Sequence, residues 1–248
     1  MYMDVASRYH EIDMARGIAI LMMVLFHTLF DLNYFQIFII QVYAGFWRYF
    51  AFATASLFLL IVGISLTISR SRALSKLSGY QLTLKFVSRG AGIFIFGLLV
   101  TVGTWLFIRE GFVVFGILHL IGVSIIISPL FFRFKKFNLV LGLLFIAIGS
   151  FLANVHGPVW LLPLGIHPAA FWSVDYEPVF PWSGVVLFGI GLGEYLYPEG
   201  KRNFALPGIP VFFEQPFAVL GRHSLIIYLV HQPLILLLLS AVFGIRLF

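Results

Sequence analysis

Several apolar runs in this chain are long enough to cross a lipid bilayer, and this feature restricts its fold more than any other. A membrane-spanning helix needs about 20 consecutive apolar residues. Of the 248 residues, 61% are hydrophobic and 10% are charged, whereas a soluble domain is roughly half apolar and about a quarter charged. Because the alternating strands of a membrane barrel are absent from the sequence, it predicts an all-α, polytopic helical bundle in the cell membrane, in contact with the lipid bilayer.

The apolar runs indicate about seven transmembrane helices. Neither an internal repeat nor a separate soluble segment interrupts them, so we expect a single transmembrane domain over residues 1–248. The expected spans are 14–33, 48–69, 90–108, 112–132, 137–155, 179–197 and 222–245.

Lysine and arginine are distributed unevenly between the loops. If the N-terminus is cytoplasmic, 13 of the 16 basic residues lie on the inner side, and only Arg48, Arg109 and Arg246 lie outside. Cytoplasmic loops of membrane proteins carry such an excess of positive charge. The sequence therefore predicts a multi-pass protein with a cytoplasmic N-terminus and an outer C-terminus. Its net charge of +6 follows from topology and indicates no nucleic-acid partner.

The first expected span, EIDMARGIAILMMVLFHTLFD over residues 11–31, contains three ionisable side chains on one helix face. Arg16 and His27 are eleven residues apart, which is ~16 Å along the axis, and Asp31 lies one turn beyond His27. Ionisable groups inside a membrane usually face the bundle interior and mark function. A carboxylate one turn from a histidine can bind one ring nitrogen and so orient the ring. The pattern therefore predicts His27 as the catalytic residue with Asp31 as its hydrogen-bonded partner.

Polar side chains in other segments are candidates for substrate binding. His119 lies in the fourth span, while Tyr228 and His231 share one face of the seventh. Asp175 lies in the long outer connection over residues 156–178. We expect spans one, four and seven to line a central cavity. The structural alternative for Tyr228 and His231 is that they only join helices by hydrogen bonds.

These residues carry a resemblance to a known family. The R-x10-H spacing of Arg16 and His27 is similar to the first-span motif of membrane acyltransferases. The whole pattern, from residue 11 to about 235, resembles the heparan-α-glucosaminide N-acetyltransferase catalytic-domain family and its small prokaryotic relatives. The matching stretches are EIDMARGIAILMMVLFHTLFDLNYF, ASLFLLIVGISL, FGILHLIGVS, DYEPVFPWSGVVLFGIGLG and LGRHSLIIYLVHQP.

The resemblance implies an acyl-CoA-dependent membrane acetyltransferase. Such an enzyme takes acetyl from cytosolic acetyl-CoA and delivers it to an amino-sugar, glycan or glycolipid acceptor on the outer side, and it uses an essential histidine. Arg16, Arg89 and Arg222 lie at cytoplasmic ends of spans and suit bidentate binding of the CoA phosphates. The alternative is that these arginines lie on the cytoplasmic side only because the topology of a membrane protein favours positive charge there, without any ligand. Whether His27 deprotonates the acceptor or accepts the acetyl group itself stays open.

Two other classes of protein are alternatives to the acetyltransferase hypothesis. One is a transporter or flippase for small molecules or lipid-linked sugars, without covalent chemistry. The other is a haem or quinone redox protein with His27, His119 and His231 as ligands. Because the chain has no cysteine and no HExxH motif, we expect no metal site of these kinds. The sequence leaves homo-oligomer formation open.

Overall fold

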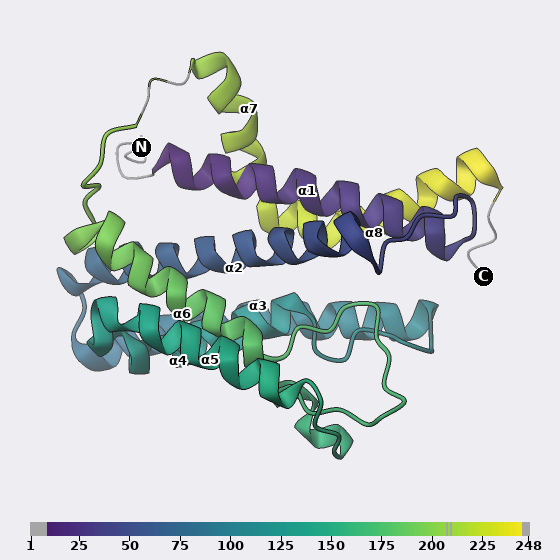
Figure 1. Cartoon of the computed structure of the whole chain (residues 1–248). Helices are drawn as coiled ribbons and strands as arrows, with labels where there is room; N and C mark the ends of the chain where they lie inside the picture. The colour runs from purple at the N-terminus through teal and green to yellow at the C-terminus, as the bar shows by residue number, and fades with distance from the viewer. Residues whose placement is uncertain (1–8, 207, 209, 245–248) are drawn as a thin grey trace. The chain divides into compact units, whose positions relative to one another are not determined.

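The structure, a computed structural model, describes residues 9–206, 208 and 210–244 (Figure 1). Helices dominate this part of the chain, and extended pairing is limited to two isolated bridges. The prediction of an all-α, multi-pass membrane protein is confirmed. The helices are α1 (His10–Tyr34), α2 (Gly45–Leu74), α3 (Gly79–Phe107), α4 (Ile117–Phe131), η2 (Phe132–Phe137), α5 (Asn138–Leu152), η3 (Val159–Leu164), α6 (Val179–Leu196), η4 (Pro198–Gly200), α7 (Val211–Arg222) and α8 (Ser224–Phe243).

The chain forms two compact units. The terminal unit comprises Met1–Phe58 and Ala205–Phe248, and the central unit comprises Leu59–Phe204. Helix α2 begins in the terminal unit and ends in the central one. Each unit is described by itself below, and the single domain expected over 1–248 stays a prediction.

In the terminal unit, α1 packs against α7 and α8. Glycines allow close approach to α7: a Cβ atom on Gly17 would lie 2.0 Å from the carbonyl oxygen of Phe217, and one on Gly221 would lie 1.8 Å from that of Asp13. Helix α7 was not among the expected spans. Its 12 residues fall short of the length that a membrane crossing requires.

Helices α1 and α8 run in the same direction. His27 contacts His231 near the middle of α8, and further along both segments Phe38 packs against Phe243. This parallel direction agrees with the odd number of crossings that the sequence predicts, and the opposite sides expected for the two chain ends stay a prediction.

The number of crossings depends on the turn between α4 and α5. By length and composition, six helical runs of the described residues could cross a membrane, and one of them, Ile117–Leu152, contains both α4 and α5. The 3-10 segment η2 separates the two helices, and within it Lys135 has a positive φ of 45°. Whether this run crosses once or twice depends on the directions of α4 and α5, and the seven crossings that the sequence indicates stay a prediction.

Packing in the central unit agrees with a reversal at this turn. Helices α3 and α4 are antiparallel, because Gly90 lies against Gly122 whereas Gly97, further along α3, lies against His119, earlier in α4. The short turn over 75–78 makes α2 and α3 antiparallel as well (Figure 1). Helix α4 therefore runs parallel to α2.

Helix α5 runs the other way. It is antiparallel to α6, since Gly142 lies against Gly184 whereas a Cβ on Gly149 would meet Pro181. Helix α6 is parallel to α2: a Cβ on Gly189 would meet the carbonyl oxygen of Leu60, and contacts further along both helices keep this order. Helices α4 and α5 therefore have opposite directions.

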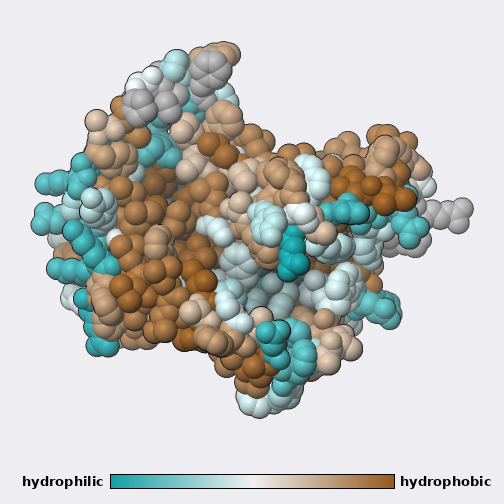
Figure 2. Space-filling model, in the orientation of Figure 1, coloured by the Kyte–Doolittle hydropathy of each residue, from teal (hydrophilic) through white to brown (hydrophobic). Residues whose placement is uncertain are grey.

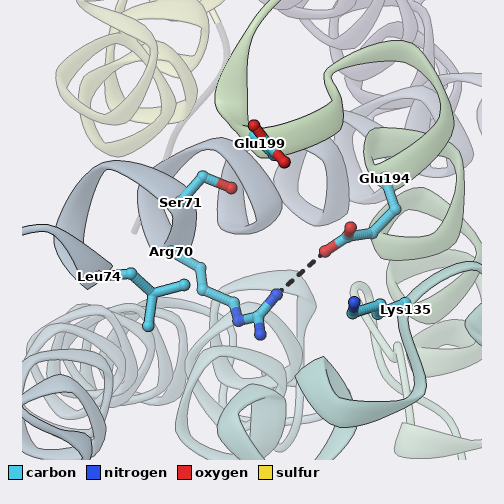
Figure 3. A pocket seen from close by; sticks show the side chains of 6 residues that line it. All are labelled: Arg70, Ser71, Leu74, Lys135, Glu194 and Glu199. Atoms are coloured by element: carbon cyan, nitrogen blue, oxygen red, sulfur yellow. Dashed lines mark hydrogen bonds and ion pairs between the residues drawn. The ribbon is translucent and has the colours of Figure 1, made fainter.

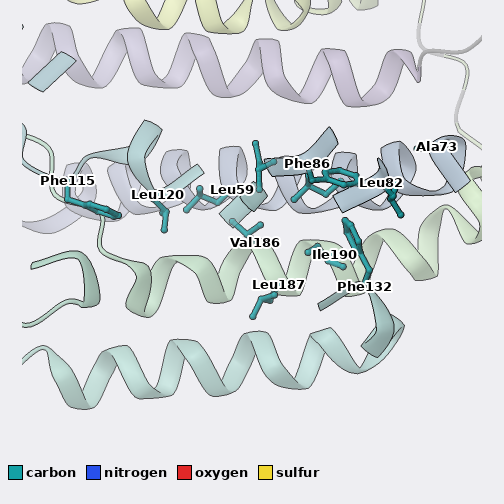
Figure 4. Close-up of a cluster of buried hydrophobic side chains, with 12 residues drawn as sticks. Leu59, Ala73, Leu82, Phe86, Phe115, Leu120, Phe132, Val186, Leu187 and Ile190 are labelled. Carbon is teal, nitrogen blue, oxygen red and sulfur yellow. The ribbon is translucent and has the colours of Figure 1, made fainter. Parts of the chain in front are cut away.

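A buried apolar cluster holds the central unit together (Figure 4). Phe86 and Phe132 meet edge to face with ring centroids 5.0 Å apart, and Leu59, Leu120 and Ile190 are almost completely buried. Close packing of this kind provides most of the stabilisation available between helices in lipid, where no hydrophobic force drives helices together.

The surface agrees with a membrane location. Large apolar side chains are exposed along α3, among them Leu99, Trp105 and Phe107, and broad apolar areas are visible in Figure 2. A soluble monomer rarely exposes contiguous apolar patches of this extent. These side chains are positioned to contact lipid.

Basic residues of the central unit gather at one end of its helices, where α2, α4 and α6 end and α3 and α5 begin. Only Arg109, after α3, lies at the opposite end. This asymmetry is the one expected for the two faces of a membrane protein, and the cytoplasmic assignment of the basic end stays a prediction. The gathered residues are Arg70, Arg72, Lys76, Lys85, Arg89, Arg133, Lys135, Lys136, Lys201 and Arg202.

Candidate functional site

Two histidines, one from α1 and one from α8, form a hydrogen-bonded pair in the terminal unit. Nδ1 of His27 lies 2.7 Å from Nε2 of His231, and the ring planes are inclined by only 19°. The ring centroids are 4.9 Å apart. This distance is close to the sum of the 2.7 Å hydrogen bond and the distances from each bonded nitrogen to the centre of its own ring. The rings therefore meet edge to edge and nearly in one plane, as a strong hydrogen bond requires.

The polar stripe expected on the first span lies on the face of α1 that is turned into the protein. Ile20, Met23 and Asp31 of this stripe are buried, and His27 is partly buried. The helical spacing that defined the stripe therefore identified the face of α1 on which the histidine pair lies.

Asp31 is held by a residue that sequence reasoning missed. The side-chain amide of Gln232 donates hydrogen bonds to both carboxylate oxygens of Asp31, at 2.9 and 2.8 Å. Gln232 follows His231 directly, so consecutive residues of α8 bind residues one turn apart on α1. The position next to His231 was the available signal, because an amide there can satisfy a buried carboxylate.

The predicted direct bond between Asp31 and His27 is not among the hydrogen bonds of the described residues. His27 pairs with His231, and Asp31, which is 3% exposed, pairs with Gln232. Both pairs tie α1 to α8 within one helical turn. The role of Asp31 as partner of His27 stays a prediction. It would act through the charge of its carboxylate, which lies one turn from His27, and not through a direct hydrogen bond.

One nitrogen of His27 remains available for chemistry. Its Nδ1 binds His231, and its Nε2 has no hydrogen-bond partner in the part of the chain that the structure describes. Tyr228, a predicted substrate ligand, packs its ring against His231 with centroids 5.6 Å apart. A histidine with one nitrogen fixed and the other free can serve as a general base or a nucleophile.

Two of the predicted phosphate-binding arginines, Arg16 and Arg222, belong to segments that pack together at the start of α1. Arg16 donates to Asp13 at 3.0 Å, and Arg222 is exposed at the end of α7. Gly221, beside Arg222, packs against Asp13 and Gly17. The terminal unit therefore brings both arginines to the same end of α1, while phosphate binding itself stays a prediction.

His119 of the central unit has a different environment from His27. Its Nδ1 accepts a hydrogen bond from the backbone N–H of Gly116 at 3.2 Å, and its Nε2 lies 3.4 Å from the hydroxyl of Thr101. The ring is 2% exposed and is enclosed by Phe94 and Phe115. Both nitrogens serve the protein itself, so the geometry favours a structural role at the start of α4. Its predicted substrate contact stays a prediction.

Asp175 also contributes to the start of α4. Its Oδ2 accepts from the backbone N–H of Ile117 at 3.3 Å, which satisfies one of the free donors of the helix N-terminus. Nearby Glu177 has an enclosed Oε2 without a hydrogen-bond partner. Burial, with a smaller contribution from the charge of Asp175, raises the pKa of Glu177 well above its usual value. Sequence reasoning did not select Glu177, because burial of a loop carboxyl leaves no mark in a sequence.

A pocket opens at the basic end of the central unit (Figure 3). Arg70 of α2 donates to Glu194 of α6 at 3.1 Å, and Lys135 and Glu199 line the same cavity of about 240 Å³. Its two acidic side chains offset the two basic ones, so the ion pair serves to join α2 and α6 rather than to attract an anion. Arg89, the third predicted phosphate ligand, lies exposed on α3 of the same unit.

The predicted cavity between spans one, four and seven would involve both units, so it stays a prediction. Among the described residues, no group of three or more His, Asp or Glu side chains is arranged to hold a metal ion.

Comparison with known proteins identifies a family. A family model described as heparan-alpha-glucosaminide N-acetyltransferase, catalytic, matches residues 8–233. This range includes both histidines of the pair, Asp31 and Gln232. No curated protein and no solved structure gives a significant match.

Proposed function

Because the chain belongs to the heparan-α-glucosaminide N-acetyltransferase catalytic family, we propose that it transfers acetyl from cytosolic acetyl-CoA to an amino-sugar or glycolipid acceptor on the outer side of the membrane. The family match makes the chain a membrane acetyltransferase. The donor, the acceptor and the catalytic residue are the parts that we propose.

One observation supports His27 as the catalytic residue. Its ring is partly buried and is fixed by a 2.7 Å hydrogen bond to another helix, while its second nitrogen has no partner among the described residues. His231 donates to a backbone carbonyl and bonds to His27, and His119 uses both nitrogens inside its own unit. Fixed orientation with a free lone pair is what general-base catalysis requires.

The proposed reaction has a simple balance. Nε2 of His27 takes a proton from the acceptor amine while the amine nitrogen attacks the thioester carbonyl. The new C–N bond replaces the C–S bond, and CoA leaves as a thiolate that takes the proton from Nε2 of His27, which restores the neutral imidazole. The products are an N-acetylated sugar and free CoA. In the alternative order His27 first accepts the acetyl group through Nε2 and then passes it to the amine.

The buried Asp31 supports the charge that this step creates. When His27 takes a proton it becomes a cation, and a carboxylate one turn away on the same helix stabilises it. Gln232 holds that carboxylate in place through two hydrogen bonds. Asp31 therefore contributes to the step through its charge, without a direct bond to the imidazole.

Binding of the donor is proposed at the basic end of α1. Arg16 and Arg222 are brought to this end by the close packing of α1 and α7, and guanidinium groups suit phosphate oxygens. Arg89 is retained as a proposed ligand from the central unit. Binding through these groups should weaken as salt concentration rises.

The test is a transfer assay on purified protein in lipid vesicles. Acetyl-CoA is supplied on one side, and glucosamine, galactosamine or an amino sugar linked to a polyprenyl carrier on the other, and both free CoA and acetylated product are measured. We expect both products to appear together and to be lost in His27→Ala. Movement of the sugar across the membrane without release of CoA would instead identify a transporter.

A further inference from the structure

His231 is fixed from two sides. Its Nδ1 lies 2.6 Å from the backbone carbonyl oxygen of Tyr228, three residues earlier in α8. Its Nε2 lies 2.7 Å from Nδ1 of His27. The ring is 7% exposed, so water has little access to compete for either nitrogen.

The carbonyl contact determines where the protons are. A carbonyl oxygen can only accept a hydrogen bond, so Nδ1 of His231 must carry a proton and donate it. In a neutral imidazole the other nitrogen then has a lone pair, and Nε2 of His231 becomes an acceptor. It follows that Nδ1 of His27 is the donor between the two rings, and that the lone pair of neutral His27 lies on Nε2.

We infer that His231 is a positioning residue, which holds His27 in the tautomer with its proton on Nδ1 and thereby makes Nε2 the reactive nitrogen. This inference rests on the proposed function of His27. It replaces the contact with substrate that the sequence predicts for His231. The backbone of α8 therefore determines both tautomers. The carbonyl of Tyr228 requires a proton on Nδ1 of His231, and the lone pair on Nε2 of His231 then requires a proton on Nδ1 of His27.

The pair also acts on the charged state of His27. Once Nε2 has taken a proton, the Nδ1–H group of His27 belongs to a cation and donates a stronger hydrogen bond to His231. The acceptor of this bond is a neutral ring instead of a carboxylate, so the charge of Asp31 acts on His27 from one turn away and not through the bond. The nearest carboxylate, Asp31, is engaged with Gln232.

Two substitutions separate a tautomer effect from a packing effect. In His231→Gln, the side-chain oxygen reaches the position of the lost Nε2 and can still accept from Nδ1 of His27. In His231→Leu, the volume is largely kept but the acceptor is lost. The exposed loop residue His156 provides the control, as His156→Leu, because its ring lies outside the helices.

Turnover is the first measurement. We expect His231→Leu to lower kcat on the order of 10²-fold with little change in KM, and His231→Gln to recover most of that loss. His156→Leu should behave as the unsubstituted protein. Equal losses in both His231 variants, or a change confined to KM for the sugar, would overturn the inference in favour of substrate contact or packing.

The second measurement does not depend on activity. Nitrogen chemical shifts of ¹⁵N-labelled histidine, with the His27 signal assigned by its loss in His27→Gln, report which ring nitrogen carries the proton. We expect Nδ1–H for His27 in the unsubstituted protein and in His231→Gln, and a shift towards Nε2–H in His231→Leu. An Nε2–H tautomer in the unsubstituted protein would overturn the inference. Expected tautomers without any acetyl transfer would instead refute the proposed function and leave only the control of the His27 tautomer by His231 standing.

Discussion

His27 of the terminal unit and His119 of the central unit are both histidines of membrane-spanning helices, yet their ring nitrogens are used differently. The ring of His27 is held by one bond from another helix, and its Nε2 is free among the described residues. The ring of His119 packs between two phenylalanines. Its nitrogens contact a backbone N–H and a threonine hydroxyl of its own unit. One site has spare hydrogen-bonding capacity and the other has none.

The comparison indicates that an intramembrane histidine is a catalytic candidate when the surrounding protein leaves one of its ring nitrogens without a hydrogen bond. A buried polar group with all its partners stabilises a fold, because breaking its bonds would leave unpaired groups behind. A group with one fixed and one open nitrogen can exchange a proton with a substrate. Substitutions at the two sites should therefore differ in the property they change, which four predictions express.

The largest effect is expected at His27. His27→Ala removes the proposed base and should lower acetyl transfer by 10²–10⁴-fold, as loss of a general acid–base group typically does. Thermal unfolding and CoA binding should stay close to those of the unsubstituted protein, because the ring is only partly buried. Near-normal turnover of folded His27→Ala would show that His27, like His119, has no catalytic role.

The next largest effect is expected at Asp31. Asp31→Asn keeps an amide able to pair with Gln232 but removes the charge that stabilises a protonated His27, so kcat should fall by about 10²-fold. Thr28→Val is the matched control, since the Thr28 hydroxyl donates to the carbonyl of Val24 in its own helix and to no other described residue. A similar loss of kcat in both variants would show a general disturbance of α1 instead of a charge effect.

A moderate effect on stability is expected at His119. His119→Leu leaves the backbone N–H of Gly116 without its acceptor, which costs about 1–3 kcal/mol of unfolding free energy. His119→Asn places an oxygen near the lost Nδ1 and should recover part of this. Denaturation in detergent gives the stabilities, and kcat per folded molecule should change little. A rise in sugar KM with unchanged stability would support the predicted substrate contact instead.

The smallest effect is expected at Glu177 and should depend on pH. Its pKa is raised on folding, so above pH 4.5, the ordinary value, the unfolded chain loses the proton while the folded chain keeps it. Stability therefore falls as pH rises through this range. Glu177→Gln should remove that fall, raising the melting temperature near neutral pH and leaving it unchanged near pH 4. Parallel pH profiles of the two proteins would contradict the assignment.

Much of the architecture could be predicted from the chain alone. Apolar runs of membrane length fixed the all-α, multi-pass class, because backbone groups in lipid must be satisfied within each segment. The helical period placed Arg16, His27 and Asp31 on one face of α1, and that face is turned into the protein. These features depend on local spacing, which a sequence displays directly.

The partners of the site residues depend on contacts between distant segments. His27 and His231 are 204 positions apart, and only the parallel packing of α1 and α8 brings them within 2.7 Å. Gln232 had no periodicity to mark it, and Asp31 was expected to bind the histidine on its own helix rather than an amide on another. Helix α7 escaped prediction because a 12-residue amphipathic segment resembles a loop between spans.

Composition and the spacing of apolar runs were sufficient to predict that this protein crosses the membrane several times and which residues are polar inside it. The matching stretches of sequence were sufficient to indicate the family. Tertiary structure alone decided that His27 pairs with His231, that Asp31 pairs with Gln232 and that His119 is enclosed. The physical reason is that hydrogen bonding depends on distance and direction in space, and helices joined by more than a hundred residues meet only after the chain has packed.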